Sequence, residues 1–108
     1  MKFNRELLKG HMKVIVLAAL RDHPAHAYAM NQRLEEITLE VFSLPKGTLY
    51  PTLHKLEKVG LIASAWTTRA KGPDVRVYSL TEKGKKVLEE SRREWSFFSR
   101  AMNLLLEG

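Results

Sequence analysis

The chain has 108 residues, no cysteine, and 18 Lys and Arg residues against 12 Asp and Glu residues, which gives a net charge of +6. This length is typical of one domain, and the lack of cysteine excludes disulfides, thiol catalysis and thiolate metal sites. The longest apolar run, Val14 to Leu20, is too short to cross a membrane, and Lys9, His11 and Lys13 interrupt any signal-peptide pattern, so we expect a cytoplasmic protein without a membrane partner.

Two helices are predicted in the first part of the chain. The first runs from about Asn4, a suitable N-cap, to Asp22, where His23-Pro24 stops it. Residues 12–20 are apolar on nearly all sides, so we expect this helix to be packed between other elements. The second runs from about residue 25 to residue 37, and a short extended piece over residues 39–41 follows. Its core-facing side chains are expected to be Ala27, Met30, Leu34 and Ile37.

A helix with two different faces is predicted from Lys46 to Val59. Leu49, Leu53 and Leu56 recur at helical spacing on one side. We expect Pro51 in the first turn, because a proline deeper in a helix costs roughly 3 kcal/mol. A small helix with an apolar back and a cationic, hydrogen-bonding front suits the major groove of DNA. That front carries Gly47, Pro51, His54, Lys55 and Lys58.

A basic β-hairpin is predicted next, with strands over residues 61–68 and 75–80. The turn between them, residues 69–74, contains Arg69, Lys71 and Gly72. Residues 43–80 hold six Lys and Arg against two Asp and Glu, so four of the six excess positive charges lie in about a third of the chain. A phosphate backbone or minor groove would give the hairpin cations a partner, whereas the alternative is a solvated loop.

The last predicted helix begins after Thr81, a good N-cap, and carries a heptad seam. One small domain could not bury all of its apolar side chains, so the simplest arrangement is a homodimer in which this helix packs on a second copy. Intramolecular packing on the first helix is the alternative. The interface residues are expected to be Leu88, Trp95, Phe98, Met102 and Leu105, with Ser91 on the same seam.

Three helices followed by a basic hairpin predict an α+β, mostly α fold: a winged helix-turn-helix domain over residues 1–80 and a dimerisation helix over residues 81–108. Three segments resemble PadR-family transcriptional regulators, namely residues 24–28 (PAHAY), 47–62 (GTLYPTLHKLEKVGLI) and 78–84 (YSLTEKG). The resemblance covers about residues 12–106, and the chain length resembles the short, LmrR-like subgroup. Ala27 and Lys46 depart from the usual family residues.

The resemblance implies a homodimeric repressor that binds double-stranded DNA at a pseudo-palindromic operator, as a nucleoid-associated protein. In similar proteins a tryptophan of the last helix stacks flat aromatic drugs. Trp95, with Phe98, Met12 and Ile15 as neighbours, is therefore a predicted site for a planar aromatic small molecule. The alternative is that Trp95 fills the dimer core. We expect His54 and Thr48 to read base edges and the other residues mostly to contact phosphate. The expected DNA contacts are Lys46, Gly47, Thr48, Tyr50, His54, Lys55, Arg69, Lys71, Gly72 and Arg76.

No enzyme, cofactor or metal site is predicted. His23 and His26 span a proline turn without a convincing third ligand, so His26 is expected to cap or pack. Two alternatives to a ligand-released repressor remain open. One is a winged-helix module whose basic face docks an acidic protein, and the other is a DNA-binding dimer without a small-molecule effector.

Overall fold

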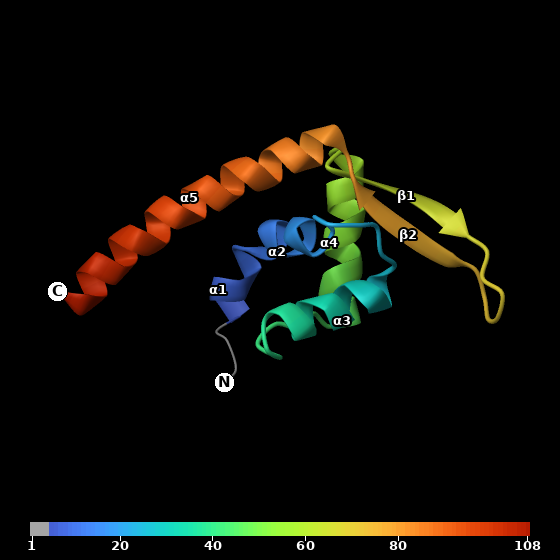
Figure 1. Ribbon diagram of the computed structural model, residues 1–108, viewed down its shortest axis with the longest axis horizontal. Helices are drawn as coiled ribbons and strands as arrows, with labels where there is room; N and C mark the ends of the chain where they lie inside the picture. Colours follow the sequence, from blue (N-terminus) through green and yellow to red (C-terminus); the bar gives the residue numbers. More distant parts are fainter. Residues whose placement is uncertain (1–4) are drawn as a thin grey trace.

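The computed structural model describes residues 5–108, so the expected N-cap at Asn4 lies outside the described residues. The helices α2, α3 and α4 form the body of the domain, while a two-stranded hairpin and the long helix α5 extend to opposite sides (Figure 1). The α+β, mostly α winged-helix fold with a C-terminal helix is confirmed. The elements are α1 (Arg5–Lys9), α2 (Met12–Ala19), α3 (Ala27–Ile37), α4 (Lys46–Lys58), β1 (Ile62–Thr67), β2 (Val75–Leu80) and α5 (Glu82–Glu107).

The first helix differs from its prediction, because it is divided into α1 and α2 at Gly10 and His11. Glycine is about 1 kcal/mol less favourable than alanine inside a helix, and the N–H of His11 bonds the carbonyl of Leu8, three residues back, at 3.0 Å. The helix also ends at Ala19 instead of Asp22. There the N–H of Leu20 bonds the Leu17 carbonyl in a tightened last turn, which ends the regular pattern before the proline is reached.

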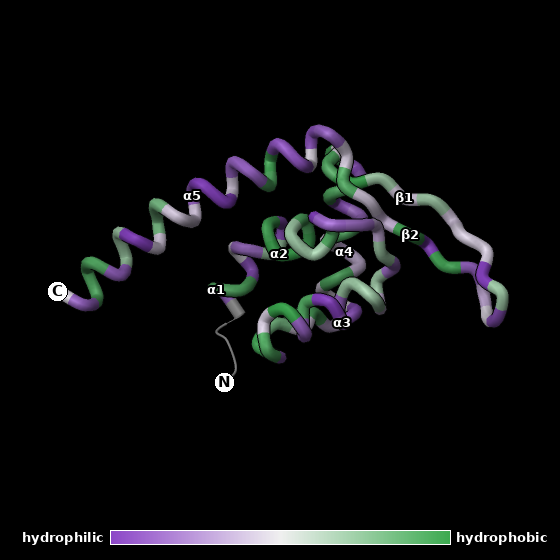
Figure 2. Tube along the Cα trace, viewed as in Figure 1, coloured by the Kyte–Doolittle hydropathy of each residue, from purple (hydrophilic) through white to green (hydrophobic). Residues whose placement is uncertain are grey.

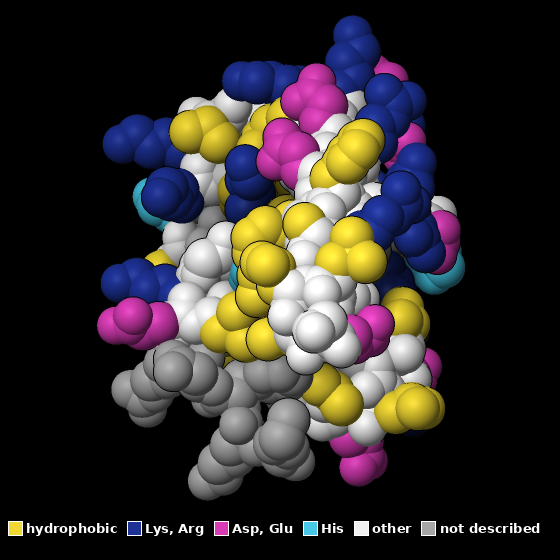
Figure 3. All heavy atoms as spheres, turned by 90° about the vertical axis from the view of Figure 1, so that its left-hand side faces the viewer, with side chains coloured by type: hydrophobic (Ala, Val, Ile, Leu, Met, Phe, Trp, Pro, Cys, Tyr) yellow, Lys and Arg dark blue, Asp and Glu magenta, His cyan; other side chains and the backbone are white. Residues whose placement is uncertain are grey.

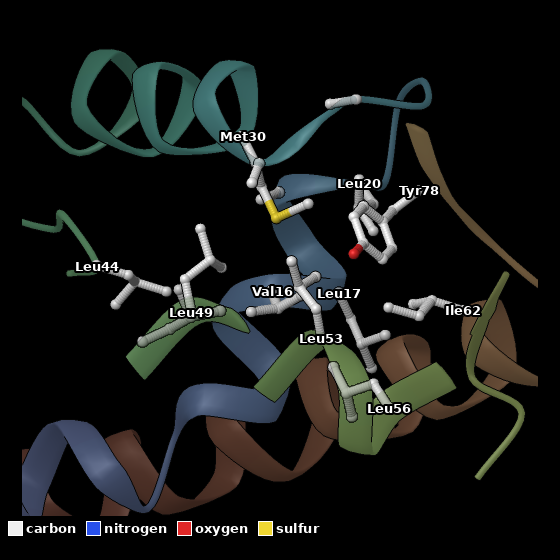
Figure 4. Packing of buried hydrophobic residues seen from close by; sticks show 14 of the residues in the cluster. Val16, Leu17, Leu20, Met30, Leu44, Leu49, Leu53, Leu56, Ile62 and Tyr78 are labelled. Carbon is white, nitrogen blue, oxygen red and sulfur yellow. The ribbon is translucent and has the colours of Figure 1, made fainter. Parts of the chain in front are cut away.

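The core is built around α2, as the apolar run in the sequence predicts. Val16 and Leu17 are fully buried, between Met30 of α3 on one side and the leucines of α4 on the other (Figure 4). Burying a side chain of this size contributes roughly 1.5–3 kcal/mol. Tyr78 and Ile62 of the hairpin close one end of the core. The expectation that this helix is packed between other elements is confirmed.

Helix α3 begins at Ala27, two residues later than predicted, because His26 is its N-cap. The N–H of Ala29 donates to Nδ1 of His26 at 3.2 Å, which confirms the capping role expected for this histidine. At the other end the prediction for Ile37 is wrong: its side chain is 62% exposed. Ile37 is the last residue of the helix, and the chain turns away from the core directly after it.

The segment over residues 39–41 is a turn, so the predicted extended piece is wrong. Leu39 and Glu40 have φ angles of 53° and 66°, and the N–H of Glu40 bonds the carbonyl of Glu35 at 2.7 Å. This bond closes the end of α3 in the manner of a left-handed helix cap. Thr38 stabilises the turn further, because its hydroxyl donates to the Leu34 carbonyl at 2.6 Å and accepts from the N–H of Phe42 at 2.9 Å.

The hairpin strands β1 and β2 pair antiparallel, with Ile62 opposite Leu80 and Thr67 opposite Val75. We call β1, β2 and their connecting turn (residues 68–74) the wing. One face of the wing looks toward the helices and carries Ile62, Ser64 and Trp66 of β1, because side chains alternate along a strand. Strand β1 begins at Ile62, one residue later than predicted. Leu61 instead closes the end of α4, because its N–H bonds the Leu56 carbonyl at 3.0 Å.

Helix α5 starts at the predicted cap. The Thr81 hydroxyl accepts from the N–H of Gly84 at 3.0 Å and donates to the Gly60 carbonyl at 2.7 Å, which ties the start of α5 to the end of α4. Ser91 is the last buried residue of the helix. Beyond it, apolar segments recur along the exposed helix to its C-terminus (Figure 2).

Candidate nucleic-acid interface

Helix α4 has the two faces that its sequence predicts. Leu49, Leu53 and Leu56 are buried, which orients the helix on the core. Its C-terminus is closed by Gly60 at a φ of 82°, a left-handed conformation that favours glycine. The residues predicted to contact DNA are thereby brought to one side of the molecule. Lys46, Gly47, Tyr50, His54, Lys55 and Lys58 are exposed, and Thr48 is half-buried.

Pro51 does not lie in the first turn of α4, and that prediction is wrong. It is the sixth residue of the helix, in the second turn. Proline has no N–H to donate to the carbonyl four residues back, which is that of Gly47. Both residues are on the exposed face, where water can solvate this carbonyl, and the three buried leucines stabilise the helix on its other face. An acceptor is thus left on the face that carries the predicted DNA contacts.

The wing places Arg69, Lys71 and Gly72 at its exposed tip, as predicted. Gly72 has a φ of 88°, and the Arg69 guanidinium folds over it, while Arg69 Nε donates to the Pro73 carbonyl at 2.9 Å. The Arg69 side chain is therefore held in the turn, whereas the Lys71 ammonium is exposed.

Arg76 has partners inside the protein that the sequence does not reveal. Its Nη2 lies 3.1 Å from Oε1 of Glu57, and its Nε donates to the Ser64 hydroxyl at 2.8 Å. The same hydroxyl donates to Oε2 of Glu57 at 2.7 Å. We call Glu57, Ser64 and Arg76 the wing strut, because they join α4 to both strands of the wing.

Tyr78 lies next to the wing strut and is tied to the start of α3. Its backbone pairs with Ala25 in both directions, at 3.0 and 2.9 Å, and the Arg76 guanidinium lies 5.9 Å from its ring centroid. Burial raises the pKa of the Tyr78 phenol above its ordinary value, and the charge of Arg76 opposes this rise. The phenol therefore stays neutral at physiological pH.

Two aromatic residues beside the expected DNA face were missed by the sequence reasoning. Tyr28 is 70% exposed and Trp66 is 68% exposed. Nothing in the sequence around Tyr28 or Trp66 indicates a DNA contact. Only their position in the fold, beside α4 and the wing, indicates it. Trp66 could have been noticed as the one large aromatic residue among the small side chains of β1.

The predicted ligand site is brought together only in part. Trp95 is half exposed, its ring lies 5.8 Å from that of Phe98, and His11 contacts it edge-on at 5.2 Å between centroids. Met12 and Ile15, by contrast, are buried members of the core. His11 was not predicted here, because the break between α1 and α2 that presents it was not foreseen.

The predicted dimer seam is divided between a buried and an exposed part. Leu88 is partly buried against the core, and Ser91 is buried within the same protomer. Trp95, Phe98, Met102 and Leu105 are exposed by 37–77%. Figure 3 shows apolar side chains gathered around the C-terminal end of α5, with Lys and Arg to either side. Intramolecular packing therefore accounts for Leu88 and Ser91 and leaves the rest of the seam, its C-terminal half from Trp95 on, uncovered.

Within residues 5–108 we find no helix able to cross a membrane, and no cluster of three His, Cys, Asp or Glu side chains suited to a metal ion.

Comparison with known proteins gives a consistent result. A family model described as the transcriptional regulator PadR-like family matches residues 16–90. The transcriptional regulator Rv3488 of Mycobacterium tuberculosis is 34% identical over 89 residues, which cover 82% of this chain and 79% of that protein. These relatives are transcriptional regulators and not enzymes, in agreement with the prediction.

Solved structures show the same fold. A PadR family transcriptional regulator from Eggerthella lenta has a TM-score of 0.81 and 32% identity, over 95% of this chain and 88% of that chain. Bacillus subtilis PadR, solved in complex with operator DNA, has a TM-score of 0.65 and 26% identity. That match covers 73% of this chain and 45% of the Bacillus protein.

Proposed function

Since the chain belongs to the PadR-like family of transcriptional regulators, we propose that it binds operator DNA as a homodimer and represses transcription. The observation that carries this proposal is the exposed face of α4, where cationic and hydrogen-bonding side chains stand beside a basic wing. The structural likeness to a PadR protein solved with operator DNA supports it.

The exposed face of α4 suggests a division of roles. His54 and Thr48 are suited to hydrogen-bond base edges in the major groove, and Gly47 lets the backbone approach closely. Lys46, Tyr50 and Lys55 are suited to contact phosphates, as are Arg69, Lys71 and the backbone at Gly72 in the wing. Arg76 would have to leave Glu57 to do the same.

A homodimer would carry two copies of α4. On a pseudo-palindromic operator these would enter successive major grooves, about 34–36 Å apart. The support for the dimer is the second half of the α5 seam, which the protomer leaves exposed. Packing of this seam on a second copy would remove its apolar side chains from water.

Salt dependence tests the DNA face. The probe is a labelled duplex selected from a random library by the parent protein, and the affinity is measured across salt concentrations. Lys55→Ala and Lys71→Ala should each weaken binding and reduce the salt slope by about one unit, because each removes one phosphate contact. Arg93→Ala is the control, since it removes an exposed cation on α5.

The outcome also separates the alternatives. The parent protein would be a protein-interaction module instead if it bound an acidic protein but bound no duplex, even at low salt. Equal affinities and slopes for the parent and the Lys55→Ala, Lys71→Ala double variant would place the DNA elsewhere on the molecule.

We further propose that a planar aromatic compound binding at Trp95 releases the DNA. The half-exposed Trp95 ring, with Phe98 and His11 beside it, supports an aromatic site on the α5 seam. Ligand and DNA should then oppose each other, typically by a factor of roughly 5–150. The compound is first identified by its quenching of Trp95 emission in a Trp66→Phe variant. The test then compares the affinity for the selected duplex with and without this compound. Equal affinities would favour a DNA-binding dimer without an effector.

A further inference from the structure

A groove lies between the wing and the start of α3, on the side of the wing that faces the helices. Its volume is about 540 Å³, and it is open to solvent. Tyr28 comes from the first turn of α3, Tyr50 from α4, and the other residues used below come from the wing. The groove residues that matter here are Tyr28, Tyr50, Trp66, Arg69, Asp74 and Arg76.

Three aromatic rings stand in this groove with much of their surface exposed. Tyr28, Tyr50 and Trp66 are all exposed, although each is among the largest side chains of its element. Trp66 lies on the same face of β1 as the buried Ile62, so its ring looks into the groove and not away from the molecule. Exposed apolar surface that is gathered in one groove often marks a site where a partner or ligand binds.

The groove offers several hydrogen-bond donors to an anionic occupant. Arg69, Arg76 and Asp74 line the groove. The charge of Arg76 is balanced by Glu57, so this guanidinium contributes N–H donors and no excess charge. The hydroxyls of Tyr28 and Tyr50 add neutral hydrogen-bond donors. A ligand that suits this groove offers hydrogen-bond acceptors to these donors and flat or apolar surface to the rings.

The position of the groove identifies the occupant. Tyr50 is both a wall of the groove and a member of the exposed face of α4, so the groove is continuous with the proposed DNA interface. A helix in the major groove and a wing at the adjacent minor groove are separated by one sugar–phosphate strand. That strand has the required chemistry, because its phosphates are anionic and its deoxyriboses offer apolar faces.

We propose that this groove holds one strand of the DNA backbone, with phosphate oxygens accepting from the Tyr28 and Tyr50 hydroxyls and a deoxyribose packed on Trp66. The inference rests on the proposed DNA-binding function. It adds Tyr28 and Trp66 to the interface and assigns them contacts that involve no charged side chain.

A purely structural role for Trp66 is the competing explanation. Arg76 is directly opposite Trp66 in the strand register and could in principle cover its ring. Arg76 instead bonds Glu57 and Ser64 and lies over the ring of Tyr78. The Trp66 ring therefore keeps the exposed surface that a DNA strand would cover.

The test uses a Trp95→Phe background, in which Trp66 is the remaining tryptophan of the two in the sequence. The probe is the duplex selected by the parent protein. Trp66 emission should change on binding and saturate with the DNA titration. Trp66→Ala should weaken binding about fivefold or more, and Tyr28→Phe several-fold, both with an unchanged salt slope, because neither change removes a charge.

Two controls keep the result interpretable. Thr67→Ala alters the neighbouring exposed residue on the outer face of the wing and should leave the affinity unchanged. Trp66→Phe keeps a ring and should recover most of the affinity lost in Trp66→Ala. If Trp66→Ala destabilises the hairpin, the affinity of Tyr28→Phe still tests whether the groove contacts DNA, because this change removes only a hydroxyl.

The inference would be overturned if the selected duplex bound fully while Trp66 emission stayed constant and Tyr28→Phe bound as tightly as the parent. It would also be overturned if a small planar anion, and not DNA, altered Trp66 emission. Failure of the parent protein to bind any duplex would instead refute the proposed function itself.

Discussion

Gly84, in the first turn of α5, shows how one residue type sets the position of a helix. A Cβ atom at this residue would overlap the carbonyl oxygen of Leu61, which is a rigid backbone atom. The Thr81 hydroxyl bonds both Gly84 and Gly60, so the same few residues fix the start of α5 against the end of α4. The absence of a side chain at Gly84 is therefore a packing requirement.

Gly84→Ala should lower the stability of the protein. The added methyl group must displace Leu61 or tilt α5, and overpacking of this kind typically costs about 1–3 kcal/mol. Urea unfolding followed by circular dichroism measures the change. Gly47→Ala is the matched control, because a Cβ there meets no atom within 4 Å and alanine favours helix. If the two variants unfolded at the same urea concentration, the tight contact with Leu61 would be wrong.

Single residues also mark where sequence reasoning reached its limit. The caps at His26 and Thr81 were predictable, because each satisfies a local hydrogen-bond pattern. The left-handed Leu39 and Glu40 were not, since such a conformation costs roughly 1–2 kcal/mol for a residue other than glycine. It is held by bonds from Thr38 and by the pairing of Asn31 with the Leu44 backbone at 2.6 and 2.9 Å, contacts between residues up to 13 positions apart.

At the scale of elements, the wing strut couples α4 to the wing. Glu57→Gln keeps the size of the side chain and removes its charge, so Arg76 would lose its ion pair and become available to DNA. The salt slope for the selected duplex should then become steeper by about one unit, while Arg76→Ala alone should change it little. Amide hydrogen exchange in β1 and β2 should accelerate in Glu57→Gln.

Glu94→Gln is the control for the loss of one negative charge, because Glu94 lies on the exposed part of α5. A salt slope that is unchanged in Glu57→Gln but reduced in Arg76→Ala would show that Arg76 already contacts phosphate in the parent protein.

The helices and strands themselves were largely predictable, since three-residue and four-residue spacing of leucines identified α4 and the hairpin turn chemistry identified the wing. The contact between Glu57 and Arg76 was not, because 19 positions separate the two residues. Pro51 was misplaced for a related reason. Helix propensity alone excludes a proline in the second turn, but burial of Leu49, Leu53 and Leu56 outweighs that penalty.

At the scale of the whole molecule, the exposed half of the α5 seam predicts association. Met102→Glu should place a charge in a desolvated helix interface, which would cost several kcal/mol and produce monomers. Sedimentation velocity at micromolar concentration measures the change. Asn103→Glu is the matched control, because it adds the same charge one residue along, off the seam. A parent protein that sediments as a folded monomer would refute the dimer and the paired-groove arrangement.

The sequence indicated the need for a partner because the heptad seam continues beyond what one small domain can bury. It could not show where intramolecular packing stops. That boundary depends on the length of α2 and on the break before it, and it falls at Ser91, the last buried residue of α5.

The joint at Thr81 and Gly84 ties the start of α5 to the C-terminal end of α4. At 1.5 Å per residue, the 26 residues of α5 extend about 39 Å from the joint and the 13 residues of α4 about 20 Å. A Cβ at Gly84 would overlap the Leu61 carbonyl, and this close contact keeps the start of α5 from sliding along the end of α4. Leu88 and Ser91 hold the first part of α5 on the core, so a second copy packed on α5 would meet it beyond Ser91, well away from the joint.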